Sequence, residues 1–179
     1  MTGVRTCALP IYPGIKPDIA ALAKGLGGGF PIGACLATKE AAKGMTAGAH
    51  GSPFGGNPLA AAVGGAVLDV VLDPDFLAHV SQMGRELRQQ LMSLKTQFPT
   101  IIAEVRGEGL MFGLKTSVPN SDFVLAAREE KLLSVLAGDN VVRLLPPLII
   151  DETHIQEASA RLTNACARLS GTVKELGAA

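Results

Sequence analysis

The chain has 179 residues, with equal numbers of basic and acidic side chains (16 each), and 47% of its residues are hydrophobic. This composition can fill a core, and the lack of net charge or of clustered lysines and arginines argues against a nucleic-acid partner. The longest apolar run, Leu59 to Val71, is interrupted by glycines and Asp69 and is shorter than the ~20 residues that a membrane helix needs. We therefore expect neither nucleic acid nor a membrane as a partner.

The cysteines and the N-terminus bear on location. Cys7, Cys35 and Cys166 stand far apart, without the spacing of metal ligands, so we expect no metal site. Free thiols are typical of a reducing compartment. The N-terminus also lacks the apolar stretch of a secretory signal. These observations predict a cytoplasmic location.

Residues 1–11 differ in character from the rest and closely resemble the peptide obtained by translating a common sequencing-library adapter. We interpret them as an artefact and exclude them from fold reasoning. On this interpretation the natural sequence starts near Tyr12, and the part that precedes it is missing.

Lys24 stands between an apolar approach and five glycines within residues 25–33. Glycine can adopt positive φ and lets another molecule or segment approach the backbone. The apolar flanks would partly desolvate the amine and lower its pKa, which suits Schiff-base chemistry. A lysine in an ordinary glycine-rich turn is the alternative. A Walker-type phosphate loop is excluded, because the lysine precedes the glycines.

The elements after Lys24 follow from period and turn chemistry. The stretch 31–38 predicts a short buried strand, and a short helix follows up to residue 45. A helix start is expected where Asn57 can cap and Pro58 suits the first helical position. This helix should cover about 58–72, and its helical spacing predicts a buried face made of Leu59, Val63, Val67 and Val70.

From residue 75 onward the pattern predicts a small α+β domain, whereas residues 12–74 look like part of something larger. A long amphipathic helix comes first, over 76–98. Short apolar runs separated by turn residues then predict a hairpin, a helix, further strands and a final helix. Their expected bounds are 101–106 and 110–116 for the hairpin, 121–131 for a helix that Ser121 could cap, 132–136, 141–144 and 148–150 for strands, and 152–176 for the final helix.

Two further stretches could carry chemistry. The glycine-rich loop His50–Pro58 runs into a helix N-terminus, which suits an anion, although a plain capping loop is the alternative. Arg143 stands alone in the apolar run 141–147. It is either paired inside the core or held for a carboxylate, which its guanidinium fits bidentately. A tight hairpin accounts for Arg106–Gly109.

These motifs match one family in order and spacing. The stretches that carry the match are 17–19, 22–34, 50–58, 105–111 and 138–147. Together they resemble the C-terminal half of class III (ornithine-type) aminotransferases, over nearly all of residues 12–179. The resemblance implies an α/β fold, the pyridoxal-phosphate-dependent transferase fold type I. Residues 12–74 would be the C-terminal part of the large cofactor-binding domain, and 75–179 the small α+β domain.

Within that family the resemblance is strongest to the enzymes of arginine biosynthesis that move the terminal amino group of N-acetylornithine to 2-oxoglutarate. Transamination of ornithine, succinylornithine or 4-aminobutyrate is the alternative within the family. The resemblance also implies a homodimer for the full-length parent. A non-catalytic α+β interaction module, in which Lys24 and its glycines serve only turns, is the alternative from another class.

The resemblance assigns roles to individual residues. Lys24 would be the catalytic lysine, which bonds to pyridoxal 5′-phosphate and later moves the substrate proton. Ser52 would contact the acylated amino-acid substrate, and Arg143 would bind the α-carboxylate. At Pro53 the family commonly has a threonine that reaches the cofactor phosphate of the neighbouring subunit; proline offers neither hydroxyl nor N–H, which predicts weaker cofactor retention.

The resemblance also implies that part of the site is absent. The family's aspartate for the pyridine nitrogen, its loop around the phosphate and its ring-stacking aromatic would all lie upstream of this sequence. We therefore expect the chain to be inactive alone.

Overall fold

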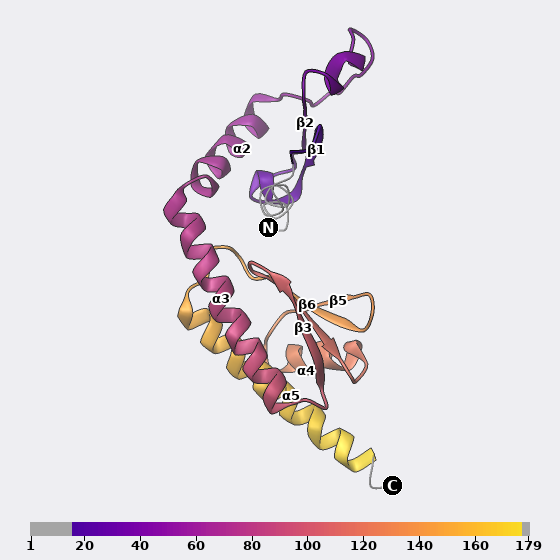
Figure 1. The fold of residues 1–179 in the computed structure, drawn as a ribbon, viewed down its shortest axis with the longest axis vertical. Helices are drawn as coiled ribbons and strands as arrows, with labels where there is room; N and C mark the ends of the chain where they lie inside the picture. Colours follow the sequence, from indigo (N-terminus) through magenta and orange to yellow (C-terminus); the bar gives the residue numbers. More distant parts are fainter. Residues whose placement is uncertain (1–15, 177–179) are drawn as a thin grey trace. The chain divides into compact units, whose positions relative to one another are not determined.

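The computed structural model describes residues 16–176 and divides into two compact units, one extending to Leu77 and the other beginning at Ala78 (Figure 1). Residues 1–11, which we interpret as an artefact, lie outside the described residues. Among the helices of the described part, none is long and apolar enough to cross a membrane.

The first unit contains a two-stranded antiparallel sheet of β1 (Ile19–Leu22) and β2 (Ala34–Ala37), with the 3₁₀ helix η1 (Lys24–Gly27) between them. A second 3₁₀ helix, η2 (Ala41–Gly44), confirms the short helix expected there. The expected strand forms in β2, but the prediction that it is buried is wrong. Most residues of β2 are exposed, because β1 is its one partner in the described part of the unit.

Helix α2 (Pro58–Val71) begins as expected, since the Asn57 side chain accepts a hydrogen bond from the Ala60 N–H at 2.9 Å. Its buried face matches the prediction only in part. Val63 and Val67 are half-buried, but Leu59 and Val70 are exposed, and the fully buried residues are Ala60 and Gly64. The reason is close packing, since a Cβ at Gly64 would lie 3.4 Å from Cδ1 of Ile32. Apolar periodicity favours large residues and does not detect such a contact.

The second unit is built on a four-stranded antiparallel sheet in the order β3-β4-β6-β5. It contains the hairpin, the long amphipathic helix and the final helix that the sequence predicts. The elements are α3 (Pro74–Gln97), β3 (Ile102–Glu108), β4 (Met111–Thr116), α4 (Asn120–Glu129), β5 (Val135–Ala137), β6 (Val141–Leu144) and α5 (Glu152–Leu176). Helix α3 spans the boundary between the units, and Figure 1 shows α3 and α5 on the same side of the sheet.

One face of this sheet and the helices share a single apolar core. Alternating residues of β4 and β6 are buried in it together with residues of α3, α4 and α5. The core includes Phe112, Leu114, Val142 and Leu144 from the strands and Leu87, Leu91, Phe123, Leu162 and Cys166 from the helices. Burial raises the pKa of the Cys166 thiol to about 12, so this cysteine is a packing residue.

Two local predictions for the second unit are wrong. The residue that precedes α4 is Pro119, whose carbonyl accepts from the Asp122 N–H, and Ser121 lies inside the first turn of the helix rather than capping it. Residues 148–150 form a turn instead of a strand. Pro146 and Pro147 precede this stretch and have no N–H for a sheet ladder.

Truncation of the core should separate packing from surface effects. Leu114→Ala removes a fully buried side chain from β4 and is expected to destabilise the chain by about 2–5 kcal/mol. Leu133→Ala, at a leucine that is 85% exposed, should change stability by less than about 0.5 kcal/mol. Urea unfolding followed by far-ultraviolet circular dichroism measures both. Equal losses for the two variants would contradict this description of the core.

Candidate active site

Lys24 opens η1 with φ of 56°, in the left-handed region. A residue with a Cβ is uncommon there, and the conformation costs about 1–2 kcal/mol. Its side chain is exposed, and its amine makes no hydrogen bond or ion pair with the described side chains of residues 16–171. Strain of this kind persists where the surrounding structure imposes it, and it is frequent at functional sites.

The glycines after Lys24 allow the loop to pack closely against Ile32 and helix α2. A Cβ at Gly27 would lie 2.7 Å from Cγ2 of Ile32, and one at Gly28 would lie 2.9 Å from Cγ2 of Val67 in α2. The expectation that apolar neighbours desolvate the Lys24 amine is wrong for the described residues. The buried residues of η1 pack toward α2 and leave the lysine side chain outside.

The loop that precedes α2 consists of two tight turns. The Gly55 N–H donates to the Ser52 carbonyl at 3.3 Å, and the Asn57 N–H donates to the Phe54 carbonyl at 3.3 Å. Pro53 is the second residue of the first turn, a position that proline favours. A Cβ at Gly55 would lie 2.8 Å from Oγ of Ser52, so the glycine leaves room for this hydroxyl. Proline at position 53 therefore fits the fold of the loop.

Arg143 lies in β6 between two core residues, Val142 and Leu144, and is half-buried. Alternation along the strand places it on the face of the sheet opposite the core. Its guanidinium makes no hydrogen bond or ion pair with any described residue. The sequence left two possibilities for Arg143, an arginine paired inside the core or one held for a carboxylate. The first does not describe this side chain.

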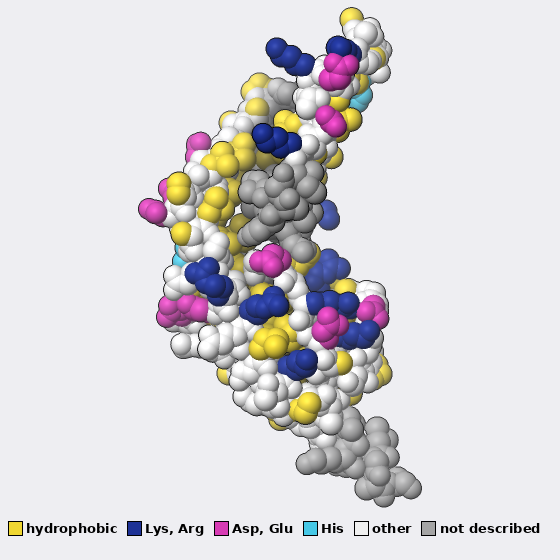
Figure 2. All heavy atoms as spheres, viewed as in Figure 1, with side chains coloured by type: hydrophobic (Ala, Val, Ile, Leu, Met, Phe, Trp, Pro, Cys, Tyr) yellow, Lys and Arg dark blue, Asp and Glu magenta, His cyan; other side chains and the backbone are white. Residues whose placement is uncertain are grey.

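A charged cluster lies on the same face of the sheet as Arg143. Asp139, in the turn between β5 and β6, accepts hydrogen bonds from Arg106 at 2.7 Å and from Lys115 at 2.9 Å. These hydrogen bonds lower the pKa of Asp139 below its usual range, and the bond to Asp139 raises the pKa of Arg106. Figure 2 shows Lys and Arg side chains intermixed with Asp and Glu over the second unit. Sequence reasoning missed this cluster.

The turn that carries Asp139 is itself fixed by Asn140. The Asn140 side chain donates to the carbonyls of Thr116 (2.6 Å) and Val118 (2.8 Å), and its oxygen accepts from the Asn120 N–H at 2.8 Å. Asp139 and Asn140 both have positive φ, which these residue types tolerate. The one sequence feature that could have pointed to this cluster is the Asp139-Asn140 pair between two apolar runs, and by itself that pair indicates only a turn.

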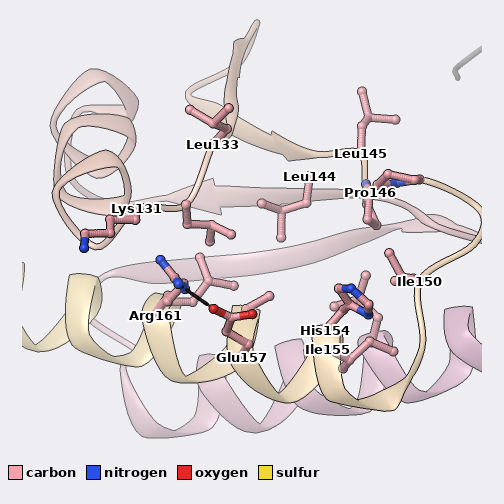
Figure 3. A pocket seen from close by; sticks show the side chains of 15 residues that line it. Lys131, Leu133, Leu144, Leu145, Pro146, Ile150, His154, Ile155, Glu157 and Arg161 are labelled. Carbon is pink, nitrogen blue, oxygen red and sulfur yellow. Dashed lines mark hydrogen bonds and ion pairs between the residues drawn. The ribbon is translucent and has the colours of Figure 1, made fainter.

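The second unit also contains a cavity of about 410 Å³, shown in Figure 3. Leu144, Leu145 and Pro146 line one side, and α5 contributes Glu157 and Arg161, which form an ion pair. None of the predicted site residues lines this cavity. Leu144 faces the core side of the sheet, so the cavity and the Arg143 side chain belong to opposite faces of β6.

The predicted site residues fall in both units. Lys24, Ser52 and Pro53 belong to the first unit, where η1 contacts α2 and the Ser52 loop caps the same helix. Arg143 belongs to the second unit, on the open face of its sheet. The structure therefore places Lys24 and Ser52 around one helix and Arg143 beside the Asp139 cluster.

Comparison with known proteins places this arrangement in a family. The model of the class-III aminotransferases matches residues 2–166, and the chain belongs to that family. Membership implies pyridoxal phosphate as the cofactor, and the mixed helix-and-sheet architecture is that of a partial fold type I enzyme.

Curated relatives within the family include acetylornithine aminotransferases. The chain is 57% identical over 159 residues to the acetylornithine aminotransferase of Brucella melitensis, covering 89% of this chain and 40% of that protein. The chain thus spans about two fifths of the length of the curated relatives that it matches.

Solved structures similar to this chain are also aminotransferases. The N-acetylornithine aminotransferase of Stenotrophomonas maltophilia matches with a TM-score of 0.79 and 34% identity, over 91% of this chain and 43% of that one. An ornithine aminotransferase from Toxoplasma gondii, described with partial occupancy of PLP at its active site, matches with a TM-score of 0.81 and 30% identity, over 88% and 38%.

The strain at Lys24 can be measured by substitution. Lys24→Gly should be more stable than Lys24→Ala by about 1 kcal/mol, because glycine adopts positive φ without a steric cost. Hydrogen exchange of the α2 amides reports the stability of the first unit. As a control, Lys43→Gly changes an exposed lysine of η2 that lacks positive φ, and it should be less stable than Lys43→Ala. The same order at both positions would contradict strain at Lys24.

The Asp139 cluster predicts an acid-sensitive contribution to stability. Because the folded state lowers the pKa of Asp139, the charged carboxylate stabilises the fold above its ordinary pKa of about 4. That contribution is lost as the pH falls through the lower folded-state value. The difference in unfolding free energy between the parent and Asp139→Asn should therefore be present at neutral pH and shrink in acid. Urea unfolding over a pH series tests this, and a difference that is constant into acid would contradict it.

Proposed function

We propose that this chain is the C-terminal part of an aminotransferase that moves the terminal amino group of N-acetylornithine to 2-oxoglutarate, with pyridoxal phosphate as cofactor. Family membership and the names of the similar relatives support the reaction class and the donor. The observation that carries the assignment to this chain is Lys24, a strained lysine with an exposed, unpartnered amine within the described residues.

The residues present fit the cofactor at its point of attachment. The Lys24 amine is free to bond to an aldehyde, and the glycines hold its backbone against α2. When bound, the cofactor supplies an electron sink for the bond that breaks at the substrate Cα. The released Lys24 amine would then move the proton between the substrate Cα and the reacting carbon of the cofactor, as general base and acid.

Arg143 is suited to the substrate carboxylate. Its guanidinium is half-buried, lies on the open face of the sheet and has no carboxylate partner among the described side chains of residues 16–171. A planar guanidinium binds a carboxylate through two parallel hydrogen bonds, so it both holds and orients an amino acid or 2-oxoglutarate. The exposed Ser52 hydroxyl would contact the acylated part of the donor.

Pro53 stands where the family commonly has a threonine, and this difference has a chemical consequence. Its position in the Ser52–Gly55 turn suits proline, but it presents neither an N–H nor a hydroxyl toward a phosphate. We infer that this loop binds the cofactor phosphate more weakly than a loop with threonine there.

In this proposal the first unit is part of the large cofactor-binding domain, and the second is the small α+β domain. A homodimer is supported by exposed apolar side chains near the Ser52 loop and along α2: Phe54, Leu59, Leu68 and Leu72. A cytoplasmic location remains a prediction from the cysteines. Ornithine, succinylornithine and 4-aminobutyrate remain alternative donors. An interaction module without catalysis is the rival from another class.

The test uses the chain extended to the length of its relatives. Addition of pyridoxal phosphate followed by borohydride should leave a permanent cofactor label on Lys24, located by peptide mass spectrometry. Lys24→Arg keeps the charge but cannot form the bond, so it should lose the label. A label on another lysine, or none, would reject the enzyme and favour the interaction module.

Pro53→Thr is a second variant of the same extended protein. It restores a hydroxyl and an N–H, so the cofactor should dissociate more slowly during dialysis, and labelling at Lys24 should persist longer. Unchanged or faster cofactor loss would show that Pro53 does not limit phosphate binding. The matched control is Pro58→Thr, at the first residue of α2, where we expect no gain in retention.

A further inference from the structure

Three residues form a row across the second unit's sheet. Strand register pairs Arg106 of β3 with Gly113 of β4, and Gly113 with Arg143 of β6. Residues paired in this way project from the same face of a sheet, so both arginines lie on the open face with only a glycine between them. Lys115 projects from the same face, since it stands two residues beyond Gly113 on β4.

Because residue 113 is a glycine, the Arg106 side chain has room to cross β4. A Cβ there would lie 3.6 Å from Cγ of Arg106 and 2.9 Å from Cγ1 of Val141, which is buried. The aliphatic part of the Arg106 side chain therefore lies against the glycine. Its guanidinium crosses β4 and binds Asp139, in the turn between β5 and β6, at 2.7 Å. A larger residue at position 113 would obstruct this crossing.

Three basic side chains on this face are candidate partners for Asp139: Arg106, Lys115 and Arg143. Arg106 starts from β3 and reaches across the sheet, whereas Arg143 lies on β6, the strand that the Asp139 turn leads into, four residues further on. Arg143 is thus nearer to Asp139 in strand order, yet Asp139 binds Arg106 and Lys115, and Arg143 binds no described residue. One carboxylate oxygen is used by each of the two partners.

We propose that Arg106 and Lys115 are positioning residues that hold Asp139 away from Arg143, so that Arg143 stays open to a substrate carboxylate. This inference rests on the proposed function, which assigns Arg143 to that carboxylate. Without Arg106, Asp139 loses its partner across the sheet and becomes an internal competitor for Arg143. Gly113 takes part by letting Arg106 cross β4.

The test measures the affinity for 2-oxoglutarate of the chain extended to the length of its relatives, by isothermal titration calorimetry, with 2-oxoglutaramide as the uncharged control. Arg106→Gln should weaken binding about twofold to fivefold, the range expected from an exposed ion pair. Adding Asp139→Asn to Arg106→Gln should restore the parent affinity. Arg106→Lys, which keeps a cation able to bind Asp139, should retain most of it.

A control distinguishes competition from a general loss of positive charge. Glu108 is an exposed carboxylate two residues after Arg106 on β3. Glu108→Gln removes the same charge as Asp139→Asn, so it should fail to restore binding in the Arg106→Gln background. Equal restoration by both would overturn the proposal, as would unchanged binding in Arg106→Gln. Circular dichroism of each variant verifies that it is folded.

Arg143→Ala separates carboxylate binding by Arg143 from the positioning of Asp139 by Arg106. If it abolishes binding while Arg106→Gln has no effect, Arg143 binds the carboxylate, but Arg106 does not position Asp139. If Arg143→Ala leaves binding unchanged, or the extended chain does not bind 2-oxoglutarate, the role of Arg143 in the proposed function and this inference both fail. Gly113→Val gives an independent variant, which should weaken binding as Arg106→Gln does and should also be rescued by Asp139→Asn.

Discussion

The second unit depends on a constraint that acts on β4 and β6: within the described part of the chain, helices cover one face of the sheet and leave the other open. Val142 and Leu144 must point into the core beneath α3, α4 and α5, and strand alternation then forces Arg143 onto the uncovered face. A one-residue slip in register would bury the guanidinium without a partner, which is costly. The apolar residues on either side of Arg143 therefore fix its position.

A different constraint organises the first unit. Ala60 and Gly64 are the buried residues of α2, and the glycines that follow Lys24 allow the loop to approach this helix closely. Small residues make the contact, so the backbone of Lys24 is held in positive φ while its side chain stays exposed. The lysine that we propose as catalytic is thus placed by backbone packing, and the described residues do not bury its amine.

Sequence patterns predicted the elements that have strong periodicity or a clear start signal. These include α2 with its Asn57 cap, the amphipathic α3, the β3–β4 hairpin and the full extent of α5. They failed where packing between small residues decided burial, as at Ala60 and Gly64, and where prolines ended a short apolar run, as at residues 148–150. The sequence identified Lys24, Ser52 and Arg143 as candidates. The Asp139 cluster required strand register, because Arg106 and Asp139 are 33 residues apart.

The most direct test is a crystal structure of the chain extended to the length of its relatives, grown with pyridoxal phosphate and glutarate. We predict that the Lys24 amine is bonded to the cofactor, that a ligand carboxylate lies on the Arg143 guanidinium, and that Arg106 and Lys115 still hold Asp139. A structure in which Lys24 is not bonded to the bound cofactor, and in which Arg143 pairs with a protein carboxylate instead of the ligand, would contradict the account.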